Sequence, residues 1–140
     1  GGNLSIPLAL TGASVVGIER DRRGIEALRA NAERLGLENL VGQVGHVHRT
    51  LPKFPIGSFD LVVLDPPRSG AAEAIEELIR LAPDRIVYVS CNPTTLARDL
   101  GQLAVHYEVE KVRPVDLFPQ TPHTEAVASL KIRDGKDHPA

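Results

Sequence analysis

The sequence is short of several residue types, and each shortage excludes a class of protein. Its 140 residues include one cysteine, no methionine and no tryptophan, and aromatic residues make up 4% of the chain. A single cysteine excludes an internal disulfide and favours a reducing compartment, so we expect a cytoplasmic protein. No apolar run approaches the roughly 20 residues that cross a bilayer, so we expect no membrane partner. The net charge of −2 lacks the basic excess of a free-standing nucleic-acid-binding domain, so any RNA contact must use a local patch or another part of the protein.

The start of the sequence and its lack of methionine predict a piece of a longer polypeptide. The chain lacks methionine and opens with Gly1-Gly2-Asn3, directly before an apolar segment. Apolar residues make up 42% of the chain and charged residues 24%, the balance of an ordinary globular protein. We expect one folded domain over residues 1–133, cut at its N-terminus, and a polar tail over residues 134–140.

Apolar patterns typical of strands and of helices alternate along the chain. They predict strands at residues 14–18, 40–47, 59–64 and 86–89, and helices at residues 4–9, 22–35, 72–82 and around 96–103. Two final strands, at 107–115 and 127–132, have no helix between them, which predicts an antiparallel pair at one sheet edge. The pattern predicts an α/β fold with a doubly wound, mostly parallel sheet and an antiparallel last strand. This resembles the Rossmann-like architecture of class I methyltransferases with the first strand missing.

The one cysteine, Cys91, follows an apolar strand and precedes Asn92-Pro93, a helix cap and a first helical residue. Free cysteines are most often small buried hydrophobes. Here the neighbours are polar, the carboxyl end of a parallel strand is where α/β sheets bind ligands, and a helix N-terminus favours a thiolate. Cys91 is therefore a candidate nucleophile.

Other strand ends carry groups suited to a nucleoside ligand. Gly2 and Asn3 close a turn whose backbone can approach a ligand, and Glu19 stands where an acid accepts hydrogen bonds from ribose hydroxyls. Asp65 begins an Asp-Pro-Pro turn directly after the strand predicted at residues 59–64. Glu19 fits a nicotinamide enzyme equally well, but the third glycine of a dinucleotide fingerprint is absent, which disfavours NAD.

Three motifs together resemble the RNA (uracil-5-)-methyltransferase family. They are Asp65-Pro66-Pro67-Arg68-Ser69-Gly70, then Ser90-Cys91-Asn92-Pro93-Thr94-Thr95-Leu96-Ala97-Arg98-Asp99, then Asp116-Leu117-Phe118-Pro119 to His123-Thr124-Glu125. Their order and spacing are those of the family. The branch that acts on 23S ribosomal RNA looks most similar, with the tRNA branch close behind. Two positions depart from the family pattern: His46 stands where an Asn or Asp is expected, and Gln120 replaces a frequent His.

The resemblance implies an activity, a cofactor and a set of site residues. It implies methyl transfer from S-adenosylmethionine to C5 of a uridine in ribosomal RNA, or in tRNA, through a covalent bond between Cys91 and C6. Cys91 is implied as the nucleophile and Glu125 as the general base, with Gly2, Asn3, Glu19 and Asp65 near the cofactor.

Two other interpretations of the function remain open at this point. A methyltransferase acting on an exocyclic amine of RNA would not need the Cys91 thiol, although such enzymes usually place an aromatic residue where Arg68 stands. The second is that the 140 residues alone are inactive, because a truncated chain can bind a ligand without turning it over. We expect a monomer, and we expect no metal because His46 and His48 have no further ligands at metal-binding spacing.

Overall fold

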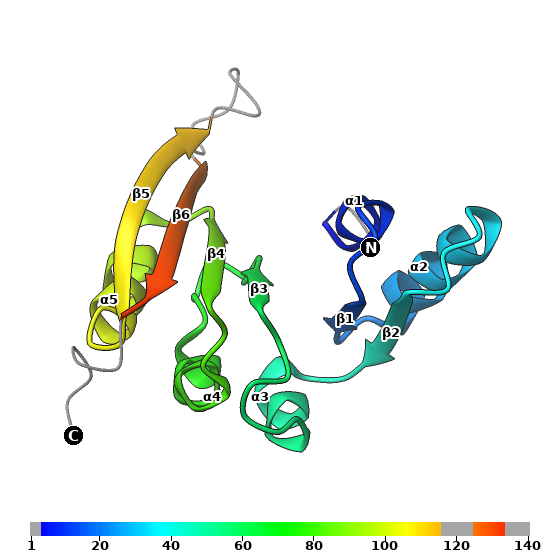
Figure 1. The fold of residues 1–140 in the computed structure, drawn as a ribbon. Helices are drawn as coiled ribbons and strands as arrows, with labels where there is room; N and C mark the ends of the chain where they lie inside the picture. The colour runs from blue at the N-terminus through cyan, green and yellow to red at the C-terminus, as the bar shows by residue number, and fades with distance from the viewer. Residues whose placement is uncertain (1–3, 116–124, 134–140) are drawn as a thin grey trace, which may run out of the picture. The chain divides into compact units, whose positions relative to one another are not determined.

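The computed structural model describes residues 4–115 and 125–133, and the chain divides into two compact units, Gly1–Lys53 and Phe54–Ala140. Figure 1 shows the elements of each unit. The first unit contains α1 (Ser5–Leu10), β1 (Val15–Glu19), α2 (Arg22–Arg34), β2 (Leu40–Val44), α3 (Val47–Thr50) and the 3-10 turn η1 (Leu51–Lys53). The second contains β3 (Leu61–Leu64), η2 (Ala72–Ala74), α4 (Ile75–Leu81), β4 (Arg85–Ser90), α5 (Pro93–Leu103), β5 (Tyr107–Val115) and β6 (Glu125–Ile132).

In the first unit, two glycines let a helix pack closely on a parallel pair of strands. Gly17 of β1 and Gly42 of β2 are partners in the β1–β2 register. A Cβ added to either glycine would meet the same methyl carbon of Leu28 in α2, at 3.0 Å and 3.4 Å. Leu28 and Ile25 are buried there, so the side chains of α2 fill the space that the two glycines leave open.

In the second unit, four strands form one sheet in the order β3-β4-β6-β5. β3 and β4 are parallel, whereas β6 runs antiparallel to both of its neighbours, β4 and β5. This arrangement confirms the predicted α/β fold with a reversed final strand. It also places the carboxyl ends of β3 and β4 at the same sheet edge as the start of β6.

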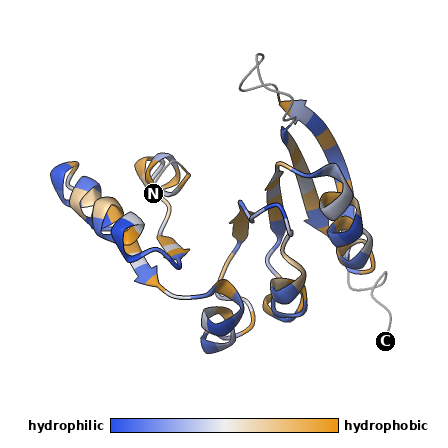
Figure 2. Cartoon of the chain, turned by 180° about the vertical axis from the view of Figure 1, so that it is seen from behind, coloured by the Kyte–Doolittle hydropathy of each residue, from blue (hydrophilic) through white to orange (hydrophobic). Residues whose placement is uncertain are grey.

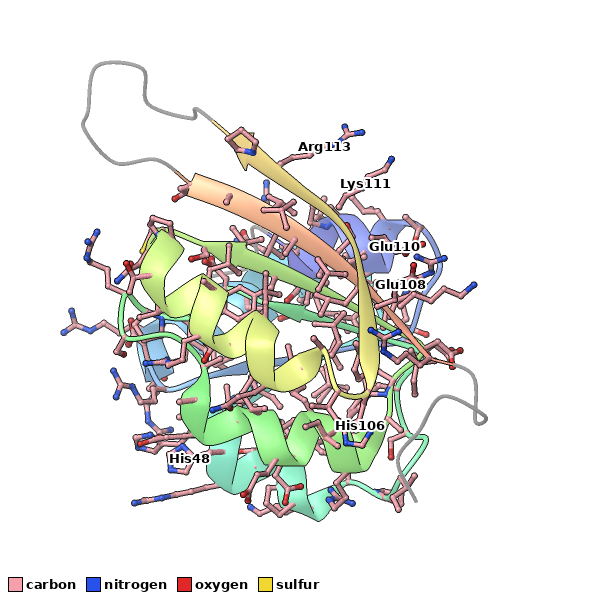
Figure 3. All side chains as sticks on the ribbon, turned by 90° about the vertical axis from the view of Figure 1, so that its left-hand side faces the viewer. His48, His106, Glu108, Glu110, Lys111 and Arg113 are labelled. Carbon is pink, nitrogen blue, oxygen red and sulfur yellow. The ribbon has the colours of Figure 1, made fainter. Side chains whose placement is uncertain are left out.

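One face of this sheet is covered by α4 and α5, which lie side by side in Figure 3. Residues of β4 and β6 that face these helices, Ile86, Tyr88 and Leu130, have no exposed surface. Leu78 of α4 and Leu103 of α5 are also fully buried, so the apolar sides of the two helices pack against this face of the sheet. Figure 2 shows hydrophobic colour on β3 and along much of β4, whereas hydrophilic residues lie on the helices and alternate with hydrophobic ones along β5.

β5 is the outer strand of the sheet and is irregular. Its register with β6 shifts between Val109 and Lys111, which leaves Glu110 as an extra residue in a β-bulge. Pro114 interrupts the backbone donors of the same strand. Figure 3 shows charged side chains following one another along β5, namely Glu108, Glu110, Lys111 and Arg113.

The predicted strand at residues 40–47 was wrong beyond Val44, because local hydrogen bonds favour a helical turn there. The backbone carbonyl of His46 accepts bonds from the Thr50 amide at 2.9 Å and from the Thr50 hydroxyl at 2.8 Å. A Cβ on Gly45 would lie 2.7 Å from that hydroxyl, so the glycine leaves it room. Val47 therefore begins α3 despite its β-branched side chain, and η1 follows directly.

Two other boundaries differ from the predictions. The helix predicted over residues 22–35 ends at Arg34, and Leu35 is its C-cap and is 47% exposed. The strand predicted over residues 127–132 begins two residues earlier, at Glu125. No helix within residues 4–115 and 125–133 is both long and apolar enough to cross a membrane.

Candidate active site

Cys91 lies in a short turn between β4 and α5, and its neighbours hold that turn closed. The Ser90 hydroxyl accepts a bond from the Asn92 amide at 3.0 Å and donates to the Asn92 carbonyl at 2.9 Å. The Asn92 side chain caps α5 by accepting a bond from the Thr94 amide at 3.0 Å, and Pro93 is the first helical residue, as predicted. Cys91 is a half-buried free cysteine, held beside a helix N-terminus whose dipole favours negative charge.

The pairing of β4 with β6 brings Glu125 to the same place. Ser90 is paired with Ala126 at the end of this antiparallel ladder. Cys91 follows Ser90, and Glu125 precedes Ala126. Because the strands are antiparallel, both candidates lie just beyond this last pair, on the same side of it. Strand register thus fixes the half-buried Glu125 next to the turn of Cys91.

Asp65 lies at the same sheet edge, directly after β3. Leu64, the last residue of β3, is paired with Tyr88 of β4. Asp65 is exposed and is followed by Pro66 and Pro67, which begin a loop that returns toward α5. The second unit therefore brings three predicted site residues, Asp65, Cys91 and Glu125, to one edge of its sheet.

The loop after Asp65 is held by the first two turns of α5. The Arg68 carbonyl accepts bonds from Asn92 Nδ2 and Thr95 Oγ1, both at 3.0 Å. The Ser69 carbonyl accepts a bond from Arg98 Nη2 at 2.8 Å. The first two motifs singled out in the sequence are therefore bound to each other by side-chain to main-chain hydrogen bonds.

A buried carboxylate anchors the far end of this loop. Asp99 has no exposed surface, and its Oδ2 accepts bonds from the Ala71 amide at 2.8 Å and from the Tyr88 hydroxyl at 2.5 Å. Its Oδ1 accepts a bond from Arg98 Nε at 3.1 Å. Burial, together with the hydrogen bond to Asp99, raises the pKa of Tyr88 well above its usual value, so Tyr88 stays a neutral donor.

Gly70 completes the loop, and a side chain at its position would be strained. Its φ of +85° lies in the region that favours glycine. A Cβ there would lie 2.5 Å from Arg98 Nη2 and 2.7 Å from Asp99 Oδ2. The glycine of the first motif therefore leaves room for the charged pair of the second.

Sequence reasoning missed the role of four residues in the second motif: Asn92 as a loop anchor, Thr95, Arg98 and Asp99. The sequence predicts Asn92 as a helix cap, whereas Thr95, Arg98 and Asp99 enter only as part of the family motif. Their spacing gave a usable signal, since residues 92, 95 and 99 share one face of a helix. The partner segment, 24 to 28 residues earlier, could not be identified from that spacing.

Glu19 is the last residue of β1, in the first unit. Its side chain is half-buried, and no hydrogen bond or ion pair of its carboxylate is found within the described residues. An uncommitted carboxylate at a strand end suits a ligand with hydroxyl donors. Gly2 and Asn3 lie outside the described residues, as do Gln120, His123 and the rest of the linker over residues 116–124.

His46 precedes α3 as its N-cap and makes no side-chain cap bond. Its ring meets that of His48 edge-on, with centroids 5.5 Å apart. Within residues 4–115 and 125–133 there is no group of three or more His, Cys, Asp or Glu side chains that could hold a metal ion.

Comparison with known proteins places this arrangement among RNA-modifying enzymes. The profile of the tRNA (uracil-5-)-methyltransferase family matches residues 50–133. An uncharacterized RNA methyltransferase of Gloeobacter violaceus is 48% identical over 93% of this chain and 28% of its own length. The 23S rRNA (uracil(1939)-C(5))-methyltransferase of Yersinia enterocolitica is 43% identical over 96% of this chain and 31% of its own.

A solved structure agrees with these matches. The crystal structure of the Pyrococcus abyssi tRNA (uracil-54, C5)-methyltransferase, in complex with S-adenosyl-L-homocysteine, aligns with a TM-score of 0.80 and 37% identity. The alignment covers 92% of this chain and 31% of that one. This chain thus spans less than a third of the length of these relatives.

Proposed function

This chain belongs to the tRNA (uracil-5-)-methyltransferase family, and from that membership we propose that it carries out methyl transfer to C5 of a uridine in RNA. The observation that carries the proposal is the β4–β6 register, which sets Cys91 and Glu125 side by side at one sheet edge. A nucleophile and a base at adjacent positions are what this reaction needs. We assign the catalytic domain to residues 1–133.

Cys91 acts first, as the nucleophile. Its thiolate adds to C6 of the uracil ring, and the electron pair of the C5–C6 bond moves toward O4 to give an enolate. The enolate makes C5 nucleophilic. Covalent catalysis thus divides one difficult reaction into easier steps. The target base has to leave its stack to reach Cys91.

Glu125 acts last, as the base. Once C5 carries both a methyl group and a proton, Glu125 removes that proton. The freed electron pair restores the C5–C6 bond and expels the Cys91 thiolate from C6, which leaves 5-methyluridine.

The methyl donor that fits this chain is S-adenosylmethionine, which supplies an electrophilic methyl group. We propose that Glu19 accepts hydrogen bonds from its ribose hydroxyls, supported by the uncommitted carboxylate at the end of β1. Gly2, Asn3 and Asp65 are the other proposed contacts. The bound S-adenosyl-L-homocysteine of the Pyrococcus abyssi enzyme supports the same choice of cofactor.

For the substrate we propose ribosomal RNA, supported by 43% identity to the Yersinia 23S rRNA enzyme against 37% to the Pyrococcus tRNA enzyme. Transfer RNA is the alternative, supported by the family profile. We further propose a cytoplasmic enzyme, since a reducing compartment keeps the single Cys91 available as a thiol.

Replacing Glu125 by Gln in the full-length protein tests the mechanism. The amide keeps the size of the side chain but is no base, so the reaction should stop after methyl transfer. We expect a methylated protein–RNA adduct that survives denaturing electrophoresis and that mass spectrometry locates on Cys91.

The matched control is the double variant Cys91→Ala, Glu125→Gln, which should form no adduct. Cys91→Ser should lower methyl transfer to background while the protein still binds S-adenosylhomocysteine. Normal turnover of Cys91→Ser would instead favour methylation of an exocyclic amine, and normal turnover of Glu125→Gln would remove Glu125 from the mechanism.

A further inference from the structure

We propose that Thr95 is a positioning residue, which holds the loop of Asp65 in register with Cys91 through the Arg68 carbonyl. The inference rests on the proposed function, because it assumes that Cys91 and Asp65 serve one reaction. It starts from the hydrogen bond of 3.0 Å between Thr95 Oγ1 and the Arg68 carbonyl oxygen.

The first step of the argument is that Thr95 is not needed to cap α5. The Asn92 side chain already performs that task through the Thr94 amide. The Thr95 hydroxyl has a single proton, and besides Arg68 its only other acceptor in the described residues is the Asn92 carbonyl, at 3.2 Å. The shorter of its two contacts, and the one that reaches beyond its own helix, is therefore with the loop.

The second step is that a fixed Arg68 carbonyl also fixes Asp65. Pro66 and Pro67 are the only residues between Asp65 and Arg68. Proline locks its own φ and restricts the residue before it, so this connection has few conformations. Holding the Arg68 carbonyl therefore restricts the Asp65 carboxylate and the Arg68 side chain together.

The third step is that the same anchor is tied to Cys91. Asn92 Nδ2 donates to the same Arg68 carbonyl, and Asn92 directly follows Cys91. One carbonyl oxygen thus links the loop, the turn of the nucleophile and the first turn of α5. Arg98 and Asp99 hold the far end of the loop independently, at Ser69 and Ala71. Loss of the Thr95 hydroxyl should therefore loosen the end near Asp65 and leave the fold intact.

Thr95→Val tests this role, since it keeps the shape of the side chain and replaces only the hydroxyl by a methyl group. The chain offers a matched control in Thr94→Val: Thr94 is exposed, in the same turn of α5, and no hydrogen bond of its hydroxyl is found in the described part of the chain. Thr95→Ser restores the hydroxyl. All three variants are to be made in the full-length protein.

The first readout is steady-state kinetics on RNA at saturating S-adenosylmethionine, well below the unfolding temperature. We expect Thr95→Val to lower kcat/KM by about tenfold, a loss on the scale of one hydrogen bond. Thr94→Val should stay within about twofold and Thr95→Ser within about threefold of the wild type, while the Tm values of the two valine variants agree. A purely structural role predicts equal kinetics for both valine variants, and that result would overturn the proposal.

The second readout does not depend on activity. Amide hydrogen exchange over residues 65–71 should be faster in Thr95→Val than in Thr94→Val. If the wild-type protein does not methylate RNA, the proposed function fails, and the exchange comparison alone then decides whether Thr95 holds the loop. Equal exchange in the two variants would reject it.

Discussion

At the scale of single residues, Gly24 shows how a missing side chain serves a neighbour. It is the third residue of α2. A Cβ added there would lie within 2.6–2.7 Å of the three carboxylate atoms of Glu19. These atoms are the far end of a flexible side chain, so an added methyl group would displace the carboxylate and leave the helix in place.

We therefore expect Gly24→Ala to stabilise the protein and to weaken cofactor binding. Alanine is favoured over glycine inside a helix by about 0.5–1 kcal/mol, which should appear in urea unfolding. S-adenosylhomocysteine should bind about tenfold less tightly in calorimetry, equivalent to roughly 1.4 kcal/mol, because Glu19 has moved.

Gly101→Ala is the matched control for this prediction. Gly101 lies in α5, and nothing stands within 4 Å of the Cβ that alanine would add. It should give a comparable gain in stability with no change in affinity. If Gly24→Ala binds the probe as well as Gly101→Ala does, Glu19 is not the residue that holds the ribose.

Asp99 marks the limit of what sequence reasoning could find at this scale. The apolar spacing of Leu96, Leu100 and Leu103 correctly predicts α5, and Leu96 and Leu103 are buried. The same spacing gives no reason to bury a carboxylate beside them. Its burial depends on Tyr88 and Ala71, 11 and 28 residues away, and such partners emerge only when the elements pack.

At the scale of elements, Tyr107 joins β5 to the connection between α4 and β4. It is fully buried at the start of β5, and its hydroxyl donates to the Pro83 carbonyl at 2.6 Å. Burial, and secondarily the negative charge of Asp84, raise the pKa of Tyr107 from its usual value near 10 to about 12. The folded state thus holds a proton that the unfolded state releases between these two values.

The contribution of Tyr107 to stability should therefore be constant below pH 10 and should be lost as pH rises from about 10 to about 12. The pKa difference corresponds to about 2–3 kcal/mol for Tyr107, added to a further loss from Tyr88, whose pKa is also raised. Tyr107→Phe should cost about 1–2 kcal/mol at pH 8, because the Pro83 carbonyl loses its donor.

The same variant should lose less stability than the wild type between pH 8 and pH 12, since one of the two buried phenols is gone. Urea unfolding at a series of pH values measures both effects. Parallel pH curves for the two proteins would show that Tyr107 does not release its proton on unfolding.

The order and type of the elements could largely be predicted from the sequence, because periodicity is a local property. The spacing of Ile25, Leu28 and Ala32 predicts one buried helix face, and all three are buried in α2. The start of β6 at Glu125 was not predicted, since polar linker residues precede it and the strand is extended by its pairing with β4 and β5. The proximity of Glu125 to Cys91 depends on that register, which no local pattern specifies.

At the scale of the whole molecule, the proposed roles divide between the two compact units. Glu19 belongs to residues 1–53, whereas Asp65, Cys91 and Glu125 belong to residues 54–140. The family profile begins at residue 50, close to this boundary. The residues of the proposed covalent chemistry and the interlocked loop thus belong to one unit, and the residue of the proposed ribose contact belongs to the other. Sequence periodicity contains no signal for such a boundary, because it reports each element separately.

The irregular outer strand also has a consequence for the behaviour of many copies in solution. A straight, unpaired strand edge is a template on which other chains add strands and fibrils begin. β5 presents a bulge at Glu110, a missing donor at Pro114 and a row of charges of both signs. An incoming strand would meet a broken hydrogen-bond ladder and would have to bury exposed charged side chains, so growth by strand addition is disfavoured at this edge. The sheet that positions Cys91 thus also disfavours self-assembly through β5.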